Sequence, residues 1–298
     1  MQADWQRGAV SVFLGAQSGK YPDGNQVIVQ GADMRVAFDT PRVANRIGPD
    51  FDGVDLVILG HVHEDHMAGL HRVPGAGVQV HEADLAAARS WEGLSRHYGY
   101  PQPVLDELHA MIVADFHYQP RPDASAYADG TVWDLGGGVR VRAHHLPGHT
   151  SGHCALVVES EGVAFIGDID LTGFGPYYGD ATSSLSQFRS SLRRVAEIDA
   201  QVWVTSHHRA IVTDRAKFLA DLQRFAGKID ERADKLLAYL QDGPQTLDEL
   251  VARRLLYPQG FHLPYVNSAE RQTVDMHLAE LAGQGRVAQD AQGRWHLT

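Results

Sequence analysis

The stretch VDLVILG-HVHEDH, residues 54–66, decides the fold that this sequence predicts. The apolar run VDLVILG is typical of a β-strand that is buried on both faces, whereas HVHEDH holds three histidines and two acids. In an extended segment, residues two apart point to the same side, so His61 and His63 can bind one ion together. We expect a helix through residues 66–73, and the turn into it directs Asp65 and His66 toward a second ion.

Three further segments place a possible metal donor at the end of an expected strand. They are LPGHTSGH with His149, FIGDIDL with Asp168 and WVTSHHR with His207. Imidazole and carboxylate groups together suit zinc, iron or manganese, and donors at several strand ends can meet at one rim of a sandwich. A solvated polar loop is the alternative interpretation of HVHEDH alone, but the same placement in four segments favours a metal site.

The first 213 residues alternate short strands with helices. This order predicts two β-rich layers with helices outside, an α+β protein with an αββα sandwich. The strands are expected at residues 9–15, 26–31, 34–39, 54–60, 78–82, 131–137, 139–146, 153–159, 163–168 and 200–208, and helices at 83–94 and 183–198. Residues 91–129 mix aromatics and prolines around one helical piece, which is typical of a lid or binding loop.

The C-terminal part has a different composition. Residues 214–243 predict a long helix, and Thr246 with Glu249 forms a capping box that opens a second one. A third helix follows, and residues 285–298 read as a hairpin. Three helices and a terminal hairpin predict a small winged-helix domain. The expected division is a catalytic domain over 1–213, a linking helix over 214–227 and the winged-helix domain over 228–298.

The four donor segments resemble the metallo-β-lactamase superfamily, and residues 61–66 match its HxHxDH pattern at every fixed position. The likeness covers roughly residues 10–210 and implies the αββα metallo-β-lactamase sandwich with two divalent metal ions, zinc in preference to iron or manganese. Residue by residue, the resemblance makes His61, His63 and His149 ligands of one ion, Asp65, His66 and His207 ligands of the other, and Asp168 the carboxylate that bridges them. It also makes Asp39 a supporting residue behind the ligands.

Other polar and aromatic residues surround these motifs. Glu64 occupies the free position of the pattern, and we expect a surface or supporting acid there rather than a ligand. His208, Tyr177 and Tyr178 are candidate substrate contacts. We expect structural or supporting roles for His144, His145 and His153, and a place in the lid for Trp91, Tyr98 and Tyr100.

The resemblance implies a hydrolase whose nucleophile is a metal-bound hydroxide, with Asp65 as the catalytic residue that orients it and shuttles a proton. The bridging Asp168 is similar to that of the glyoxalase II, lactonase and nuclease branches. We expect a small-molecule ester, thioester or lactone as substrate. Three alternatives stay open: an endoribonuclease or phosphodiesterase like the β-lactamase-like protein 2 group, which shares the terminal winged helix; a mononuclear iron oxygenase of the same fold; and a binding module without activity.

Charge and cysteine content limit the classes of binding partner and the cellular compartment that we expect. The net charge of -11 argues against a broad surface for nucleic acid or anionic membranes. Residues 228–298 hold eight Lys/Arg and ten Asp/Glu, so they lack the basic excess of a module that grips phosphates. The single cysteine, Cys154, fits a reducing compartment, and we find neither a signal peptide nor a membrane span. We therefore expect a cytoplasmic protein, with a homodimer as one possible assembly.

Overall fold

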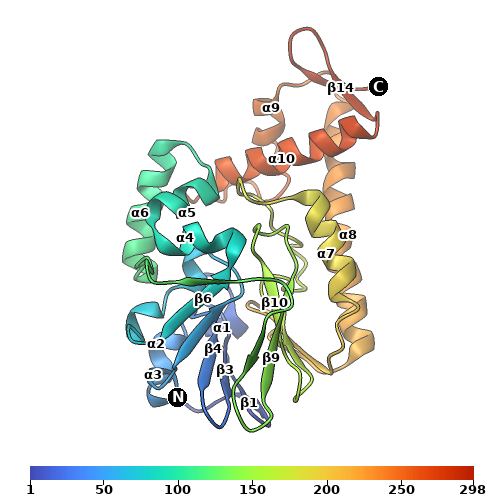
Figure 1. Ribbon diagram of the computed structural model, residues 1–298. Coiled ribbons are helices and arrows are strands. Elements are labelled where there is room, and N and C mark those ends of the chain that lie inside the picture. Colours follow the sequence, from blue (N-terminus) through green and yellow to red (C-terminus); the bar gives the residue numbers. More distant parts are fainter.

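The computed structural model describes residues 1–298 and contains two stacked β-sheets (Figure 1). The first sheet has seven strands in chain order, antiparallel from β1 to β4 and parallel from β4 to β7. They are β1 (Trp5–Arg7), β2 (Val10–Phe13), β3 (Gln26–Gln30), β4 (Arg35–Phe38), β5 (Leu56–Leu59), β6 (Gly77–His81) and β7 (Ser125–Tyr127).

The second sheet has six strands in the order β13-β12-β11-β10-β9-β8, and β11 with β12 is its parallel pair. They are β8 (Val132–Asp134), β9 (Arg140–His145), β10 (Cys154–Val158), β11 (Val163–Phe165), β12 (Val202–Val204) and β13 (Ile211–Val212).

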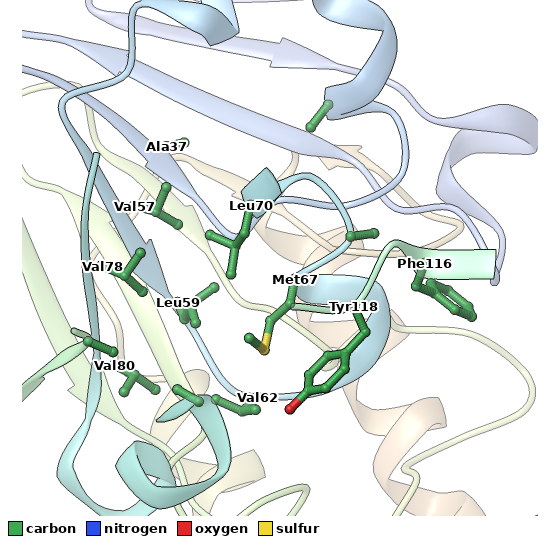
Figure 2. Packing of buried hydrophobic residues seen from close by; sticks show 14 of the residues in the cluster. Ala37, Val57, Leu59, Val62, Met67, Leu70, Val78, Val80, Phe116 and Tyr118 are labelled. Atoms are coloured by element: carbon green, nitrogen blue, oxygen red, sulfur yellow. The ribbon is translucent and has the colours of Figure 1, made fainter. Parts of the chain in front are cut away.

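Strand β5 shows how the layers are held together. Leu56 and Ile58 face the core between the two sheets, whereas Val57 and Leu59 face the core under the helices on the outer side. Figure 2 shows this outer core, in which Val57 and Leu59 lie beside residues such as Leu70. The prediction that this strand is buried on both faces is confirmed, because alternate side chains enter two different cores.

Helices cover the outer faces of both sheets, so the predicted αββα sandwich is confirmed. The first sheet is covered by α2 (Ala44–Ile47), α3 (Pro49–Asp52), α4 (Leu85–Arg89), α5 (Trp91–Tyr98) and α6 (Gln102–Phe116). The second sheet is covered by α7 (Leu185–Val195) and by the first half of α8 (Arg215–Leu240). One short turn of helix, α1 (Ala16–Gly19), lies between β2 and β3.

The prediction of a helix through residues 66–73 is wrong. The segment forms two 3-10 turns instead, η1 (Glu64–His66) and η2 (Leu70–Arg72). The carbonyl oxygen of His66 accepts hydrogen bonds from the backbone N–H and the hydroxyl of Thr40, at 2.8 and 3.1 Å. In an α-helix, that oxygen would accept a hydrogen bond from the backbone N–H of Leu70. The N–H of Leu70 donates to the carbonyl oxygen of Met67 instead. A contact from a distant segment therefore replaces the helix.

The lid or binding loop expected over residues 91–129 is mostly helical, although Tyr98 and Tyr100 of this segment line the cavity described below. The segment holds the two helices α5 and α6, joined at Gly99, whose φ of 68° ends the first one. Trp91 stacks on His109, with ring centroids 4.1 Å apart. Tyr98 and Tyr100 are buried. The segment is part of the covering layer and not an open flap.

The C-terminal part lies at one end of the sandwich (Figure 1). It contains the second half of α8, then α9 (Leu247–Ala252), α10 (Val266–Gly283) and a hairpin of β14 (Val287–Gln289) and β15 (Trp295–Leu297). The predicted capping box of Thr246 and Glu249 is present. The winged-helix classification and the boundaries after residues 213 and 227 stay predictions.

Helix α10 connects this part to both halves of the sandwich. Tyr265, at its start, packs against the outer core of the first sheet, and Met276 packs against that of the second. In Figure 1 the helix runs across the end of the sandwich. The helices α8 and α10 also share a separate apolar core with the hairpin, which includes Leu236, Leu278 and Val287. None of the helices is both long and apolar enough to cross a membrane.

We expect His277 to make the protein less stable in acid. This residue is fully buried in α10, with Nε2 2.9 Å from the hydroxyl of Tyr178. Burial, with the charges of Arg232 and Arg189, lowers the pKa of His277 to about 3. A histidine in the unfolded chain has a pKa near 6.5. Between about pH 6.5 and pH 3, the unfolded state therefore binds a proton at His277 and the folded state does not. The free energy of unfolding falls as the pH falls through this range.

The test compares the wild type with His277→Gln by urea unfolding at several pH values. Between pH 7 and pH 5, the wild type should lose about 2 kcal/mol more unfolding free energy than the variant, because each pH unit contributes about 1.4 kcal/mol. A difference between the two proteins that does not change with pH would contradict the prediction.

Candidate metal centre

The predicted donors all follow strand ends or lie in turns at one rim of the sandwich. His61, His63, Asp65 and His66 follow β5, His149 lies in the turn from β9 to β10, Asp168 follows β11 and His207 follows β12. The glycine before Asp168 is needed for this placement. Gly167 has a φ of 56°, and a Cβ there would lie 2.5 Å from Nε2 of His153.

Three imidazoles converge in a first group. Nε2 of His61 lies 3.2 Å from Nδ1 of His63, and Nε2 of His149 lies 3.1 Å from both of these atoms. Oδ2 of Asp168 approaches the same point, at 3.3 Å from His149 Nε2 and 4.0 Å from His61 Nε2. Four donor atoms of this kind are the set that tetrahedral zinc takes.

A second group forms on the other side of Asp168. Oδ1 of this carboxylate lies 3.1 Å from Nε2 of His66 and 3.6 Å from Nε2 of His207. Asp65 completes the group, with Oδ2 3.2 Å from His207 Nε2 and Oδ1 3.7 Å from His66 Nε2. The structure thus brings all seven predicted donors together, and the two oxygens of Asp168 face different groups.

Carboxylates behind the donors orient two of the imidazoles. Nδ1 of His66 lies 2.7 Å from Oδ2 of Asp39, the residue expected to support the site. Nε2 of His63 lies 2.8 Å from Oδ2 of Asp180, which the sequence interpretation missed. Such partners fix the ring and the tautomer so that the other nitrogen keeps its lone pair for a metal ion.

Backbone carbonyl groups orient two more imidazoles. His149 donates from Nδ1 to the carbonyl oxygen of Tyr177 at 3.0 Å, and His207 donates from Nδ1 to those of Gly19 and Asp23 at 2.8 and 3.0 Å. A neutral imidazole that donates from one nitrogen presents a lone pair at the other. In both residues that other nitrogen, Nε2, faces the donor groups.

These residues fit metal ions. Three nitrogen lone pairs that point at one spot, about 3 Å from each other, repel unless a cation lies between them. Nε2 of His66 and Oδ1 of Asp168 are buried, and although they lie 3.1 Å apart, neither makes a hydrogen bond of acceptable geometry, which is costly for polar atoms unless something else binds them. The donor set, histidine with aspartate, is the one that zinc, iron and manganese accept.

Burial and neighbouring charges shift the pKa values of His63 and Glu64. Burial alone would lower the pKa of His63, but the hydrogen bond and the charge of Asp180 raise it to about 9. Burial raises the pKa of Glu64 above its ordinary value, and the neighbouring Asp65 raises it further. Glu64 is buried and accepts hydrogen bonds from Tyr21 and Tyr98. It therefore supports the site from within the protein and is not a surface acid.

Five of the seven donors, all except His61 and His66, line part of a cavity of about 550 Å³. Of the predicted substrate contacts, Tyr177 and His208 line this cavity. Tyr178 does not: its side chain is fully buried in the core of the second sheet and bonds Arg232 and His277. Consecutive residues of this extended loop point in opposite directions, so the expectation for Tyr178 is corrected.

The sequence interpretation named none of the residues with which the C-terminal segment lines the cavity. Tyr257, Pro258, Phe261 and Tyr265 line it from the segment between α9 and α10. The sequence did hold a signal for this segment, because aromatic residues are dense in the stretch LLYPQGFHLPY.

His144 and His145 lie outside both donor groups, as expected. His153 supports the site, because its Nε2 lies 3.2 Å from the backbone N–H of Asp168 and can accept from it.

Comparison with known proteins shows the family of the chain. Residues 36–207 match the model of a family described as the metallo-beta-lactamase superfamily. A solved structure of a metallo-beta-lactamase family protein from Thermus thermophilus superposes with a TM-score of 0.68 and 26% identity, over 92% of this chain and 94% of that one.

Two fungal proteins are similar in sequence, and both are named atrochrysone carboxyl ACP thioesterase. The protein of Passalora fulva is 29% identical over 252 residues, which are 81% of this chain and 63% of that protein. The protein of Pseudocercospora fijiensis (strain CIRAD86) is 27% identical over 183 residues, 60% of this chain and 53% of that protein. The chain thus spans about half to two thirds of the length of these relatives.

Proposed function

Because the chain belongs to the metallo-beta-lactamase superfamily, we propose that it is a hydrolase that uses two divalent metal ions and cleaves a small-molecule thioester, ester or lactone. One observation carries the proposal: the two oxygens of Asp168 face two complete donor groups beside a cavity. Zinc suits this set best, with iron or manganese as alternatives. The residues that would hold the first ion are His61, His63 and His149, those for the second are Asp65, His66 and His207, and Asp168 would bind both.

Such ions, when bound, lower the pKa of water and polarise the carbonyl group under attack. The protein supplies the rest of the chemistry. Asp65 lines the cavity and is only 5% exposed, so its carboxylate can orient the attacking water, accept its proton and pass that proton to the leaving group. His63 and His66 are held in place by Asp180 and Asp39, which keeps the site rigid during turnover.

The composition of the cavity supports a carbonyl substrate over a phosphodiester. Phosphoryl transfer needs cationic groups that clamp the transferring phosphate. The cavity is lined by one lysine, Lys20, and no arginine, and the chain has a net charge of -11. The names of the fungal relatives support a thioester within the carbonyl class. A thiolate is also a good leaving group, so it requires little protonation.

The test is a side-by-side assay of an acyl thioester, a lactone, an aryl ester, a β-lactam, a bis-aryl phosphate and single-stranded RNA. The protein is assayed as purified, after removal of metal and after reloading with zinc, iron or manganese. We expect one of the thioester, lactone or ester substrates to be cleaved with the highest kcat/KM, and only by metal-loaded protein. Cleavage of RNA or of the phosphate diester with a kcat/KM far above every carbonyl substrate would replace the proposal with the nuclease alternative.

A further inference from the structure

The cavity beside the candidate metal centre has walls that are mostly aromatic. Eight of its 21 lining residues are tyrosine or phenylalanine, whereas Leu108 is its one aliphatic side chain apart from Pro258. We infer that the cavity binds the acyl part of its substrate as a flat aromatic ring system, and that Tyr257 and Phe261 determine this preference. The inference deepens the proposed function and rests on it for the reaction, though not for the binding of the ring.

Two of the wall tyrosines are fixed by one buried carboxylate. Glu64 accepts hydrogen bonds from Tyr98 at 2.6 Å and from Tyr21 at 3.0 Å. Because Glu64 binds both hydroxyl groups, these two side chains present their rings to the cavity while their polar ends are already satisfied. The wall on this side is therefore set before any ligand arrives.

A second buried carboxylate fixes two more of the wall tyrosines. Asp180 accepts hydrogen bonds from Tyr100 at 2.5 Å and from Tyr177 at 3.3 Å, while it also bonds His63 of the donor group. The rings of Tyr98 and Tyr100 stack at 5.6 Å with planes 19° apart. Four tyrosines are thus held by two carboxylates, and a ligand that fits between them loses little affinity to ordering of the protein.

The C-terminal segment supplies the wall where the cavity opens to solvent. The rings of Tyr257 and Phe261 stack at 5.4 Å with planes 9° apart, and the ring of Phe174 lies 5.7 Å from that of Tyr257. Phe174 and Phe261 are 41% and 40% exposed although both are apolar. Large aromatic side chains that stay exposed in a cavity commonly mark the surface that a ligand covers.

Shape and chemistry together select an aromatic ring over a saturated one. Aromatic pairs gain about 0.5–1.5 kcal/mol beyond the area that they bury, which corresponds to about 2- to 12-fold in affinity per pair. An alkyl chain gains only from burial, and nearly every apolar side chain that it would meet is a ring. Donors of both groups, among them His149 and His207, line the same cavity as these rings, so a ligand can place its carbonyl group at the donors and its ring between the walls.

The test uses two thioesters of one thiol, 2-naphthylacetyl and decahydronaphthylacetyl. They share a carbon skeleton, and neither carbonyl group is conjugated, so the two ring systems differ in aromaticity and in the flatness that comes with it, which are the two properties that the inference concerns. We expect the wild type to prefer the naphthyl compound about tenfold in kcat/KM. Phe261→Leu and Tyr257→Leu should each reduce this ratio severalfold. Leu219→Ala, at a 38% exposed apolar position on α8 outside the cavity, is the matched control and should leave the ratio unchanged.

Binding is measured separately, so that the two proposals can fail separately. Calorimetry with the two product carboxylates should give a dissociation constant about tenfold lower for the naphthyl compound, and urea unfolding checks that each variant is folded. Equal kcat/KM and equal affinity for the two ring systems would overturn this inference and leave the hydrolase intact. Tight binding of the naphthyl compound without hydrolysis of any thioester, ester or lactone by the metal-loaded protein would instead overturn the proposed function and retain the aromatic site.

Discussion

Asp65→Asn is expected to reduce kcat about a thousandfold on the best carbonyl substrate. The change keeps the shape of a side chain that is 5% exposed and lines the cavity, but asparagine can neither accept the proton of an attacking water nor return it. Loss of a general acid-base group costs about 10² to 10⁴ in rate. The measurement is steady-state kinetics, together with elemental analysis and unfolding of the same protein sample.

The adjacent Glu64→Gln is the matched control for this prediction. It also removes a buried carboxylate from the cavity wall, but this carboxylate holds Tyr21 and Tyr98 and has no assigned role in proton transfer. We expect Glu64→Gln to change KM more than kcat. A fall in kcat of less than tenfold for Asp65→Asn, with its metal retained, would remove Asp65 from the catalytic role.

His207→Ala should remove about one of two bound metal ions, whereas His208→Ala should remove none. Nε2 of His207 faces Asp65 at 3.2 Å and Asp168 at 3.6 Å, and the residue is buried. The next residue, His208, is exposed at the edge of the cavity and belongs to neither donor group. Two neighbouring histidines of the same chemistry therefore form a matched pair.

Elemental analysis after dialysis against metal-free buffer measures the effect. We expect close to two ions per chain in the wild type and in His208→Ala, and close to one in His207→Ala. Loss of metal from His208→Ala but not from His207→Ala would show that the ligand assignment is wrong. A wild type that holds a single iron ion at every metal loading would favour the oxygenase alternative.

The sequence by itself determined the sandwich and brought out the seven donors. Strand β5 alternates Leu56 and Ile58 with Val57 and Leu59, and the period of two requires a core on each face. The donors follow strand ends in four segments, and strands of one sandwich end at a shared rim. The capping box of Thr246 and Glu249 could also be predicted from the sequence. Each of these signals is local, because a few consecutive residues contain the whole pattern.

Tertiary structure alone decided the walls of the cavity and the partners of the donors. The carbonyl oxygen of His66 bonds Thr40, and this contact across 26 residues replaces an expected helix. Asp180 reaches His63 across 117 residues, and Phe261 enters the cavity because α10 packs across both halves of the sandwich. Tyr177 and Tyr178 are identical neighbours, yet one faces the cavity and the other the core. No local pattern holds this information, because the free energy of each contact depends on which distant segment packs there.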